Sequence, residues 1–350
     1  MRRVVRDSAA AFVFVWALST VSAQDRPGSK APLFTAEAAR ASVTEIAAIV
    51  SREYMDPAIA DRLADALRRR LRDGRYAGAT MPGALAARVT RDLLAESGDK
   101  HLAVSVVPES RPTAAAPSNS RADGVRRTNG GVRRVEILPG NVGYLELTSF
   151  WRLDEAREAI ADAMRLLRRA DAVIIDMRQN TGGSPDTVAF LAGYLFDKSG
   201  LPLFDIVWRS DTPRAYATPA PAPDERDERR PVYVLTAART FSAGEGLAFL
   251  LQERGRARVV GERTAGAANP GRSHRVNQWF EVTVPNGKVR GAVSGKNWEG
   301  VGVPPDVSVP ASDALRAAHL EALRELVART PAGAWRDALD REIRTLERTR

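Results

Sequence analysis

Apolar residues recur at helical spacing through the first third of the chain. Three stretches place them three and four positions apart, as on one face of a helix: 35–50, 57–73 and 83–97. A strand-like run over 102–107 follows the third stretch. The pattern therefore predicts a small N-terminal helical domain spanning 34–107.

From residue 131 on, short apolar runs of strand type alternate with helical patterns. Strands are predicted at 132–137, 142–147, 172–175, 232–236, 257–260, 280–284 and 289–293, and helices at 154–169, 185–196 and 247–251. The turn sequences Pro139-Gly140-Asn141 and Asn286-Gly287 predict two hairpins. Alternation of this kind implies βαβ units, so we expect an α/β (α+β) domain over 131–310, with a mixed sheet covered by helices. Two more helical patterns lie within 311–350.

Two segments differ from this pattern. Residues 108–130 are rich in Pro, Ser, Ala, Asn and Arg and offer little to bury, which indicates a linker. Residues 1–23 combine a basic start, a short apolar run over Ala9–Leu18 and a small-residue cleavage site at Val21-Ser22-Ala23. This is typical of a secretory signal peptide, so we expect an exported protein, periplasmic or secreted, with no integral membrane segment after cleavage.

Composition narrows the chemistry. The chain has no cysteine, which excludes thiol nucleophiles, disulfides and cysteine-based metal sites. Its net charge is +9, but the arginines are scattered through helical patterns, which favours a solvated basic surface over a nucleic-acid interface. Dinucleotide, phosphate-loop and His-Glu-x-x-His motifs are all missing, so we expect no cofactor and no metal. The sequence does not determine an oligomeric state.

Ser242 is the candidate for nucleophilic chemistry. It follows the strand pattern 232–236 and precedes a helical pattern, a position where a hydroxyl can lie beside free backbone N–H groups. Ser242 and Glu245 also spell a capping box, in which both side chains bond backbone N–H groups of the first helical turn. The local sequence alone leaves both interpretations open.

A serine nucleophile needs a base and donors for the oxyanion. The histidines are His101, at the junction of the two predicted domains, His274, in a basic loop, and His319, in a C-terminal helical pattern where we expect it at the surface. Gly182-Gly183 follows the carboxyl end of a predicted parallel strand, where ligands bind in open α/β sheets. These glycines are either a substrate-facing turn or a purely structural one.

Six stretches together resemble the S41-type serine peptidase family, which includes the tail-specific (C-terminal processing) proteases. They resemble most the branch of the interphotoreceptor retinoid-binding protein and the tricorn protease core. They occur in the family's order at 98–102, 142–145, 174–183, 240–245, 261–266 and 298–306. The resemblance implies a layered catalytic domain like those of ClpP and crotonase, and a peptide or protein substrate. Residues 108–130 leave no room for the PDZ domain common in the tail-specific branch.

The resemblance also implies roles for individual residues. Ser242 would be the nucleophile, His101 the general base, and Glu299 the carboxylate that supports the imidazole. The backbone N–H groups of Gly183 and Ala243 would form the oxyanion hole, with Gly182, Lys100 and Glu245 as auxiliary candidates. The tail-specific lysine has no counterpart in Thr264-Ala265-Gly266-Ala267-Ala268, so the base must come from elsewhere.

Lys100 is a departure from the family pattern, because a small residue or serine usually precedes the histidine. Its charge would lower the basicity of His101. An alternative function is therefore a non-catalytic module that binds an apolar ligand or a protein on the same fold. A hydratase of the crotonase type is a third reading, although no signature of a nucleotide thioester is present.

Overall fold

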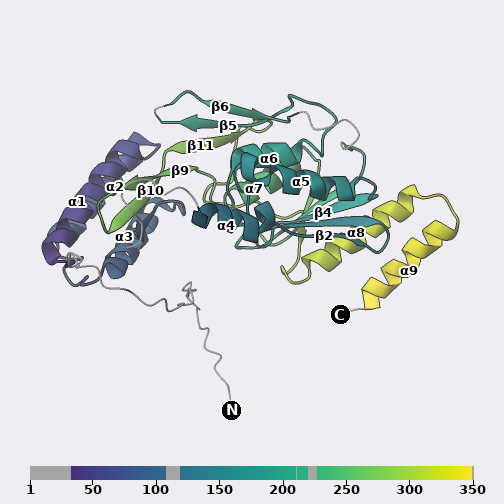
Figure 1. Cartoon of the computed structure of the whole chain (residues 1–350), viewed down its shortest axis with the longest axis horizontal. Coiled ribbons are helices and arrows are strands. Elements are labelled where there is room, and N and C mark those ends of the chain that lie inside the picture. The colour runs from purple at the N-terminus through teal and green to yellow at the C-terminus, as the bar shows by residue number, and fades with distance from the viewer. Residues whose placement is uncertain (1–32, 108–118, 210, 220–226, 349–350) are drawn as a thin grey trace, which may run out of the picture. The chain divides into compact units, whose positions relative to one another are not determined.

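The computed structural model describes residues 33–107, 119–209, 211–219 and 227–348 (Figure 1). Its helices are α1 (Ala36–Glu53), α2 (Pro57–Arg72), α3 (Pro82–Ser97), α4 (Asn119–Arg127), the 3-10 turn η1 (Asn129–Gly131), α5 (Leu153–Leu167), α6 (Pro185–Ala192), α7 (Ala243–Glu253), α8 (Ala314–Arg329) and α9 (Ala334–Arg348). Its strands are β1 (Ala103–Val106), β2 (Val132–Leu138), β3 (Val142–Leu147), β4 (Ala172–Asp176), β5 (Pro202–Trp208), β6 (Arg214–Ala217), β7 (Val232–Thr236), β8 (Arg258–Gly261), β9 (Gly271–Arg275), β10 (Phe280–Pro285), β11 (Gly287–Gly291) and β12 (Val307–Ser308). The expected signal peptide lies outside the described residues.

The central sheet has six strands in the order β12-β8-β7-β4-β3-β2. Neighbouring strands are parallel from β12 to β3, and only β2 and β3 pair antiparallel, so the sheet is mixed as predicted. Every residue of β4 and of β7 is buried, as expected for central parallel strands. Both strands end at the same edge of the sheet, which brings the segments that follow them close together.

Helices cover both faces of this sheet. Val173 and Ile175 of β4 pack into the core that also contains α5, α6 and α7. Ala172 and Ile174 point the other way and pack under α8 and α9. This alternation is the two-residue period of a strand, and it produces the three-layered α/β architecture expected from the sequence.

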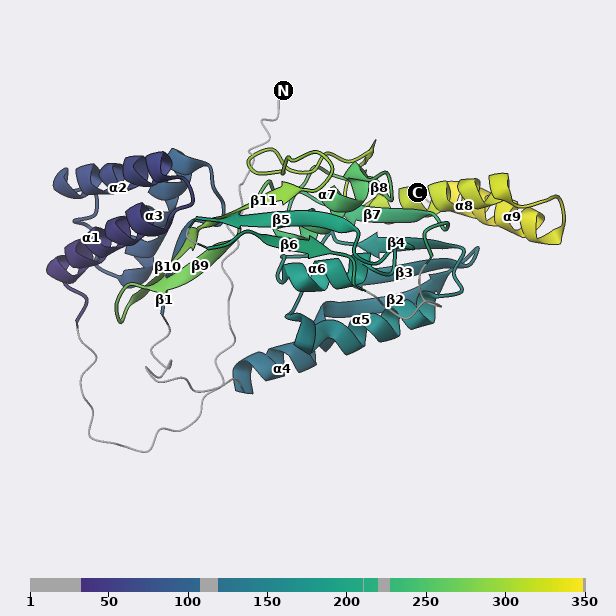
Figure 2. The same ribbon diagram turned by 90° about the horizontal axis from the view of Figure 1, so that it is seen from above.

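The N-terminal helices have a core of their own. α1, α2 and α3 enclose apolar side chains together with β1 and with Phe280, Val282 and Val284 of β10. β1 pairs with β10, and β10 with β9, so strands far apart in the sequence share one small sheet (Figure 2). Thr35 caps α1 by accepting the N–H of Ala38 at 3.1 Å, where the helical pattern begins in the sequence. The turn between α3 and β1 carries His101.

One predicted hairpin is confirmed and the other is wrong. β2 and β3 pair across Gly140 and Asn141, both with positive φ. β10 and β11 do not pair with each other: β10 pairs with β1 and β9, whereas β11 pairs with β5. The N–H groups of Asn286 and Gly287 both donate to the carbonyl of Pro270, and the chain passes from one sheet to another instead of turning back.

Other expectations also need correction. His319 is 5% exposed, and its Nε2–H donates to the carbonyl of Pro139 at 2.8 Å, so it is a buried packing residue. His274 lies in β9 and not in a loop. β5 and β6 were not anticipated, and α4 falls within the stretch expected to be a linker. In the described part of the chain, every helix is too short or too polar to cross a membrane.

Candidate functional site

Ser242 lies between β7 and α7, as predicted. Its φ is 54° and its ψ is −122°, an uncommon conformation for a residue other than glycine. The strain stays because neighbours hold both sides: the N–H of Phe241 donates to the carbonyl of Asn180 at 3.1 Å, and the N–H of Gly246 donates to the carbonyl of Ser242 at 2.9 Å. Strained backbone of this kind clusters at functional sites.

Glu245 fixes the same turn from within. It is fully buried, and its carboxylate accepts the N–H of Ser242 at 2.8 Å, as a capping residue does. The carboxylate also accepts the hydroxyl of Thr264 and the N–H of Gly266, each at 2.6 Å, and the N–H of Ala267 at 3.0 Å. Burial raises the pKa of Glu245, and these four donors oppose that shift. Glu245 therefore ties the serine turn to the segment after β8, which is more than the helix start expected of it.

His101 reaches Ser242 across 141 positions of sequence. Its Nε2 lies 3.0 Å from the Oγ of Ser242, which is hydrogen-bond distance. The imidazole also contacts the ring of Phe241, with centroids 4.8 Å apart. Burial lowers the pKa of His101, so the ring is neutral at neutral pH and can accept a proton. The structure thus brings together the serine and the histidine that the sequence singled out.

Asp99 supports the histidine, and sequence reasoning missed it. It is 2% exposed, and its Oδ1 accepts the N–H of His101 at 3.0 Å. Its Oδ2 accepts the Tyr54 hydroxyl at 3.3 Å and the Asn269 amide at 3.1 Å. An aspartate two residues before the histidine is the pattern of an Asx turn, so the signal was available in Asp99-Lys100-His101.

Glu299 lies beside this pair. Its Oε2 accepts the N–H groups of Ala268 at 2.6 Å and Asn269 at 3.0 Å, while its Oε1 is buried without a hydrogen-bond partner. Burial, followed by the charge of Asp99, raises the pKa of Glu299 to about 7. The Nδ1 of His101 is also buried without a partner. Each residue thus has one buried polar atom without a partner, and His101 and Glu299 approach within 4.8 Å through one atom each.

One cluster of possible metal ligands is present among the described residues. It consists of Asp99, His101 and Glu299, each with one oxygen or nitrogen atom within 4.8 Å of the others. Both oxygens of Asp99 and one of Glu299 already accept hydrogen bonds, and the Nε2 of His101 faces Ser242. Only one oxygen and one nitrogen remain for a metal. The arrangement fits a proton relay better than a metal site, which needs more ligands.

Gly182 and Gly183 pass close to the serine turn. A Cβ on Gly182 would lie 2.6 Å from the Cβ of Ser242, and one on Gly183 would lie 1.9 Å from the carbonyl oxygen of Phe150. Both glycines have positive φ, 94° and 135°. Within the described chain, the N–H groups of Gly183 and Ala243 have no acceptor. Two free donors therefore lie at one pocket with Ser242, as an oxyanion hole requires.

Asn180 holds the glycine turn in place and was not anticipated as a site residue. It is fully buried, and its side chain donates to the carbonyl of Leu147 at 3.1 Å and accepts the N–H of Gly182 at 2.8 Å. Its backbone carbonyl accepts the N–H of Phe241. Asn180, in the loop after β4, thus connects the glycine turn with the serine turn after β7.

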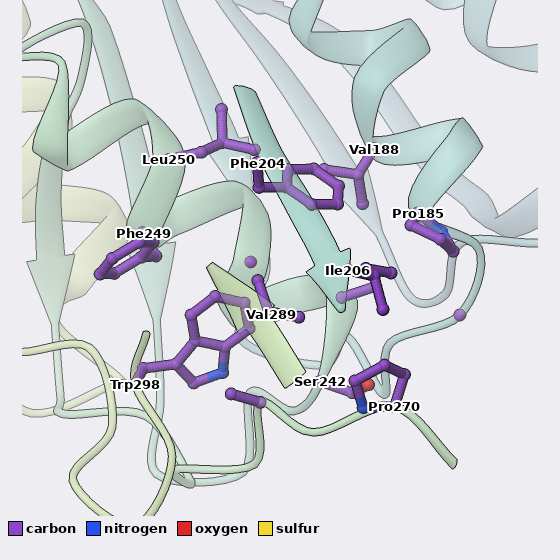
Figure 3. A pocket seen from close by; sticks show the side chains of 14 residues that line it. Pro185, Val188, Phe204, Ile206, Ser242, Phe249, Leu250, Pro270, Val289 and Trp298 are labelled. Carbon is purple, nitrogen blue, oxygen red and sulfur yellow. The ribbon is translucent and has the colours of Figure 1, made fainter. Parts of the chain in front are cut away.

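An apolar pocket of about 60 Å³ lies next to Ser242 (Figure 3). Its wall combines the serine turn, α6, α7, β5, β11 and the loops after β8 and β11. The lining side chains are almost all apolar: Pro185, Val188, Phe204, Ile206, Phe249, Leu250, Pro270, Val289 and Trp298. A pocket of this lining favours a small or medium apolar group close to the serine hydroxyl.

Lys100 does not enter the site. It is exposed, and its ammonium donates to the carbonyl of Ala265, in the segment that carries no lysine of its own. The contact joins the His101 turn to the segment after β8 that Glu245 also holds. Lys100 is therefore a bridging residue beside the site.

Two family models match this chain. The model of peptidase family S41 matches residues 141–309, and the model of the N-terminal domain of peptidase S41 in eukaryotic IRBP matches residues 33–129. The chain belongs to peptidase family S41. The two matches cover both the region that supplies His101 and the region that supplies Ser242.

Curated relatives of this S41 chain are processing proteases. A carboxyl-terminal-processing protease of Synechocystis sp. is 36% identical over 134 residues, which is 37% of this chain and 29% of that protein. The chloroplastic carboxyl-terminal-processing peptidase 2 of Arabidopsis thaliana is 29% identical over 198 residues, 50% of this chain and 34% of that protein. The aligned part is thus about a third of the length of each relative.

Solved structures share the fold of this S41 chain. A lipoprotein from Streptococcus agalactiae matches 86% of this chain and 99% of its own, with 15% identity and a TM-score of 0.52. The tricorn protease matches 89% of this chain and 37% of its own, with 13% identity and a TM-score of 0.50. At this identity the likeness concerns the architecture alone.

Proposed function

We propose that this chain is a serine peptidase that hydrolyses peptide bonds through an acyl-enzyme on Ser242, with His101 as general base. The observation that carries the proposal is the 3.0 Å distance between the Nε2 of His101 and the Oγ of Ser242. Membership of family S41 and the free donors at Gly183 and Ala243 support it. A non-catalytic binding module would need neither a histidine at hydrogen-bond distance from the serine nor free N–H donors beside it.

In the proposed mechanism, the Ser242 oxygen attacks the substrate carbonyl while its proton passes to the Nε2 of His101. The N–H groups of Gly183 and Ala243 stabilise the oxyanion, and the amino end of α7 adds a favourable dipole. Collapse of the intermediate breaks the C–N bond, and His101 gives its proton to the leaving amine. A water then attacks the acyl-enzyme by the same route and releases Ser242.

Glu299 has a defined part in this scheme. Nε2 can accept a proton only when the hydrogen of the neutral imidazole is on Nδ1, and that N–H needs an acceptor. The unpartnered Oε1 of Glu299 is the carboxylate oxygen available to it, directly or through one water. We infer that Glu299 is a positioning residue that selects the tautomer of His101.

The apolar pocket suggests which type of side chain precedes the scissile bond of the substrate. It adjoins Ser242 and both proposed oxyanion donors, so the substrate side chain next to the attacked carbonyl would enter it. Its apolar lining suits an apolar side chain better than a charged one. Because residues 1–23 have the pattern of a signal peptide, we also propose that the peptidase is exported, periplasmic or secreted. The helical unit 34–107 would supply His101, and residues 131–310 would supply Ser242.

A fluorophosphonate probe tests the central claim. The purified protein is expected to be labelled at Ser242, because the probe reacts with activated serines, and peptide mapping would locate the adduct. Ser242→Ala should abolish both labelling and peptide hydrolysis, whereas Ser184→Ala, a serine outside the proposed relay, should be labelled like the wild type. Labelling that persists in Ser242→Ala would refute the assignment.

The pH profile tests Glu299. Because its pKa is raised to about 7, kcat/KM is expected to rise between pH 6 and pH 8 as the carboxylate ionises. The free energy of unfolding should change with pH in the opposite direction. A carboxyl group with a raised pKa stabilises the fold when protonated, and this contribution is lost as pH rises through 7. Glu299→Gln should lower kcat/KM by about 100-fold at pH 8 and remove the step near pH 7.

Thermal unfolding of Glu299→Gln across the same pH range serves as the control. The variant keeps an oxygen for the N–H groups of Ala268 and Asn269, so it should fold. A step near pH 7 that is unchanged in Glu299→Gln would show that another group governs the profile.

A further inference from the structure

A second, larger cavity adjoins the proposed active site. Its volume is about 940 Å³, and its wall is formed by the α1–α2 junction, the end of β5, β11 and the loop before Trp298. Asp99, Asn269 and Glu299 of the site line one part of it. Val289 lines both this cavity and the apolar pocket at Ser242, so the two spaces share β11 as a wall.

The alternation of β11 gives the two spaces different chemistry. Gly287, Val289 and Gly291 are buried, whereas Lys288 and Arg290 are exposed. Lys288 and Arg290 line only the larger cavity, and Lys296 joins them from the following loop. One strand therefore presents an apolar side chain to the small pocket and cationic side chains to the large one.

The carboxylates of this cavity already have donors. Asp56 caps α2 by accepting the N–H groups of Ala58 and Ile59 at 2.9 and 3.1 Å. Asp99 and Glu299 each accept backbone N–H groups, as described above. In the described part of the chain, none of these carboxylates forms an ion pair with Lys288 or Lys296.

The cations differ in how they are paired. Arg290 forms an ion pair with Asp205 at 2.8 Å, and Arg209 donates to the backbone carbonyls of Ser51 and Tyr54. Lys288 and Lys296 have no side-chain partner among the described residues. Within the described chain, two ammonium groups without a side-chain partner thus line a cavity that Asp99 and Glu299 of the site also line.

We propose that this cavity binds an acidic side chain of the substrate, so that the preferred substrate is an extended peptide with an apolar residue at the cleavage position and an aspartate or glutamate nearby. The inference rests on the proposed peptidase function. Successive side chains of an extended peptide point to opposite sides, so one peptide can fill the apolar pocket and the lysine-lined cavity at once. Lys288 and Lys296 are then specificity residues that contact the substrate away from the reacting atoms.

Blocked peptides test this substrate preference. The peptides are N-acetylated and C-amidated, so they carry no terminal charge. Each peptide has the same apolar residue at the cleavage position, and Glu, Gln or Lys is placed at each flanking position in turn. The expected kcat/KM is about tenfold higher for Glu than for Gln at one or more positions, mainly through KM, and the advantage should shrink at high salt. The double variant Lys288→Glu/Lys296→Glu should reverse the order to favour Lys.

Lys198→Glu is the matched control, since Lys198 is equally exposed and lies outside both cavities. It should keep the wild-type preference and should be labelled by the fluorophosphonate at the wild-type rate. Equal kcat/KM for Glu and Gln at every position would overturn the proposal while leaving the peptidase intact.

Binding separates the two proposals. Fluorescence anisotropy of labelled Glu and Gln peptides on Ser242→Ala measures the preference without catalysis. Tighter binding of the Glu peptide, lost in Ser242→Ala/Lys288→Glu/Lys296→Glu, supports a lysine-lined site for acidic side chains even if no hydrolysis occurs. Equal binding of both peptides contradicts it.

Discussion

Replacing His101 with alanine is expected to lower kcat/KM by about 10⁴-fold without unfolding the protein, because Ser242 would lose the group that takes its proton. The imidazole is 3.0 Å from the serine oxygen, and its lowered pKa keeps it neutral and ready to accept. Initial rates on a peptide with an apolar residue at the cleavage position would measure the loss.

The loss should not add to that of Ser242→Ala. Residues that act as a unit are non-additive, so the double variant His101→Ala/Ser242→Ala is expected to be as slow as either single variant. His274→Ala is the control, since His274 lies in β9 outside the site and should leave kcat/KM within about twofold. Near wild-type turnover in His101→Ala would refute the proposed mechanism.

Gly183→Ala is expected to cost about 3 kcal/mol or more of folding free energy and to abolish activity. The new Cβ would lie 1.9 Å from the Phe150 carbonyl oxygen, and φ is 135°, so the loop cannot keep its path. That path holds the N–H that is proposed to stabilise the oxyanion. Urea unfolding monitored by tryptophan fluorescence would measure the stability, and initial rates the activity.

Gly200→Ala separates backbone strain from the clash. Gly200 also has positive φ, 69°, but a Cβ there meets nothing within 4 Å. Its substitution should cost only about 1–2 kcal/mol and leave activity unchanged. If Gly183→Ala were no more destabilising than Gly200→Ala, the close approach to Phe150 would be irrelevant.

Sequence reasoning predicted the elements that periodicity and chain order determine. The parallel strands β4 and β7 are continuous apolar runs, and the segments after them, with Gly183 and Ser242, had to meet at one sheet edge. The partner of Ser242 could not be derived this way, because a distance across 141 positions has no local signal. The family resemblance supplied His101, and the geometry agrees.

The remaining differences have physical causes. Asn286-Gly287 has the composition of a hairpin turn, but tertiary pairing with Pro270 overrides it. β5 is only a short run before a Pro-rich stretch, so its pairing with β11 was invisible locally. Asn180 acts through a hydrogen bond to the distant carbonyl of Leu147, which has no local signal, whereas the turn at Asp99 has a local signal that periodicity does not show.

The small sheet β1-β10-β9 has a consequence for how this site could be divided or transplanted. His101 precedes β1, and the side chains that close the core of α1, α2 and α3 include Phe280, Val282 and Val284 of β10. A fragment ending after β1 would leave that wall missing and expose an apolar face to water. A fragment that carries His101 must therefore also include β10, which follows Ser242 in the sequence. The base and the nucleophile are thus held in one folding unit.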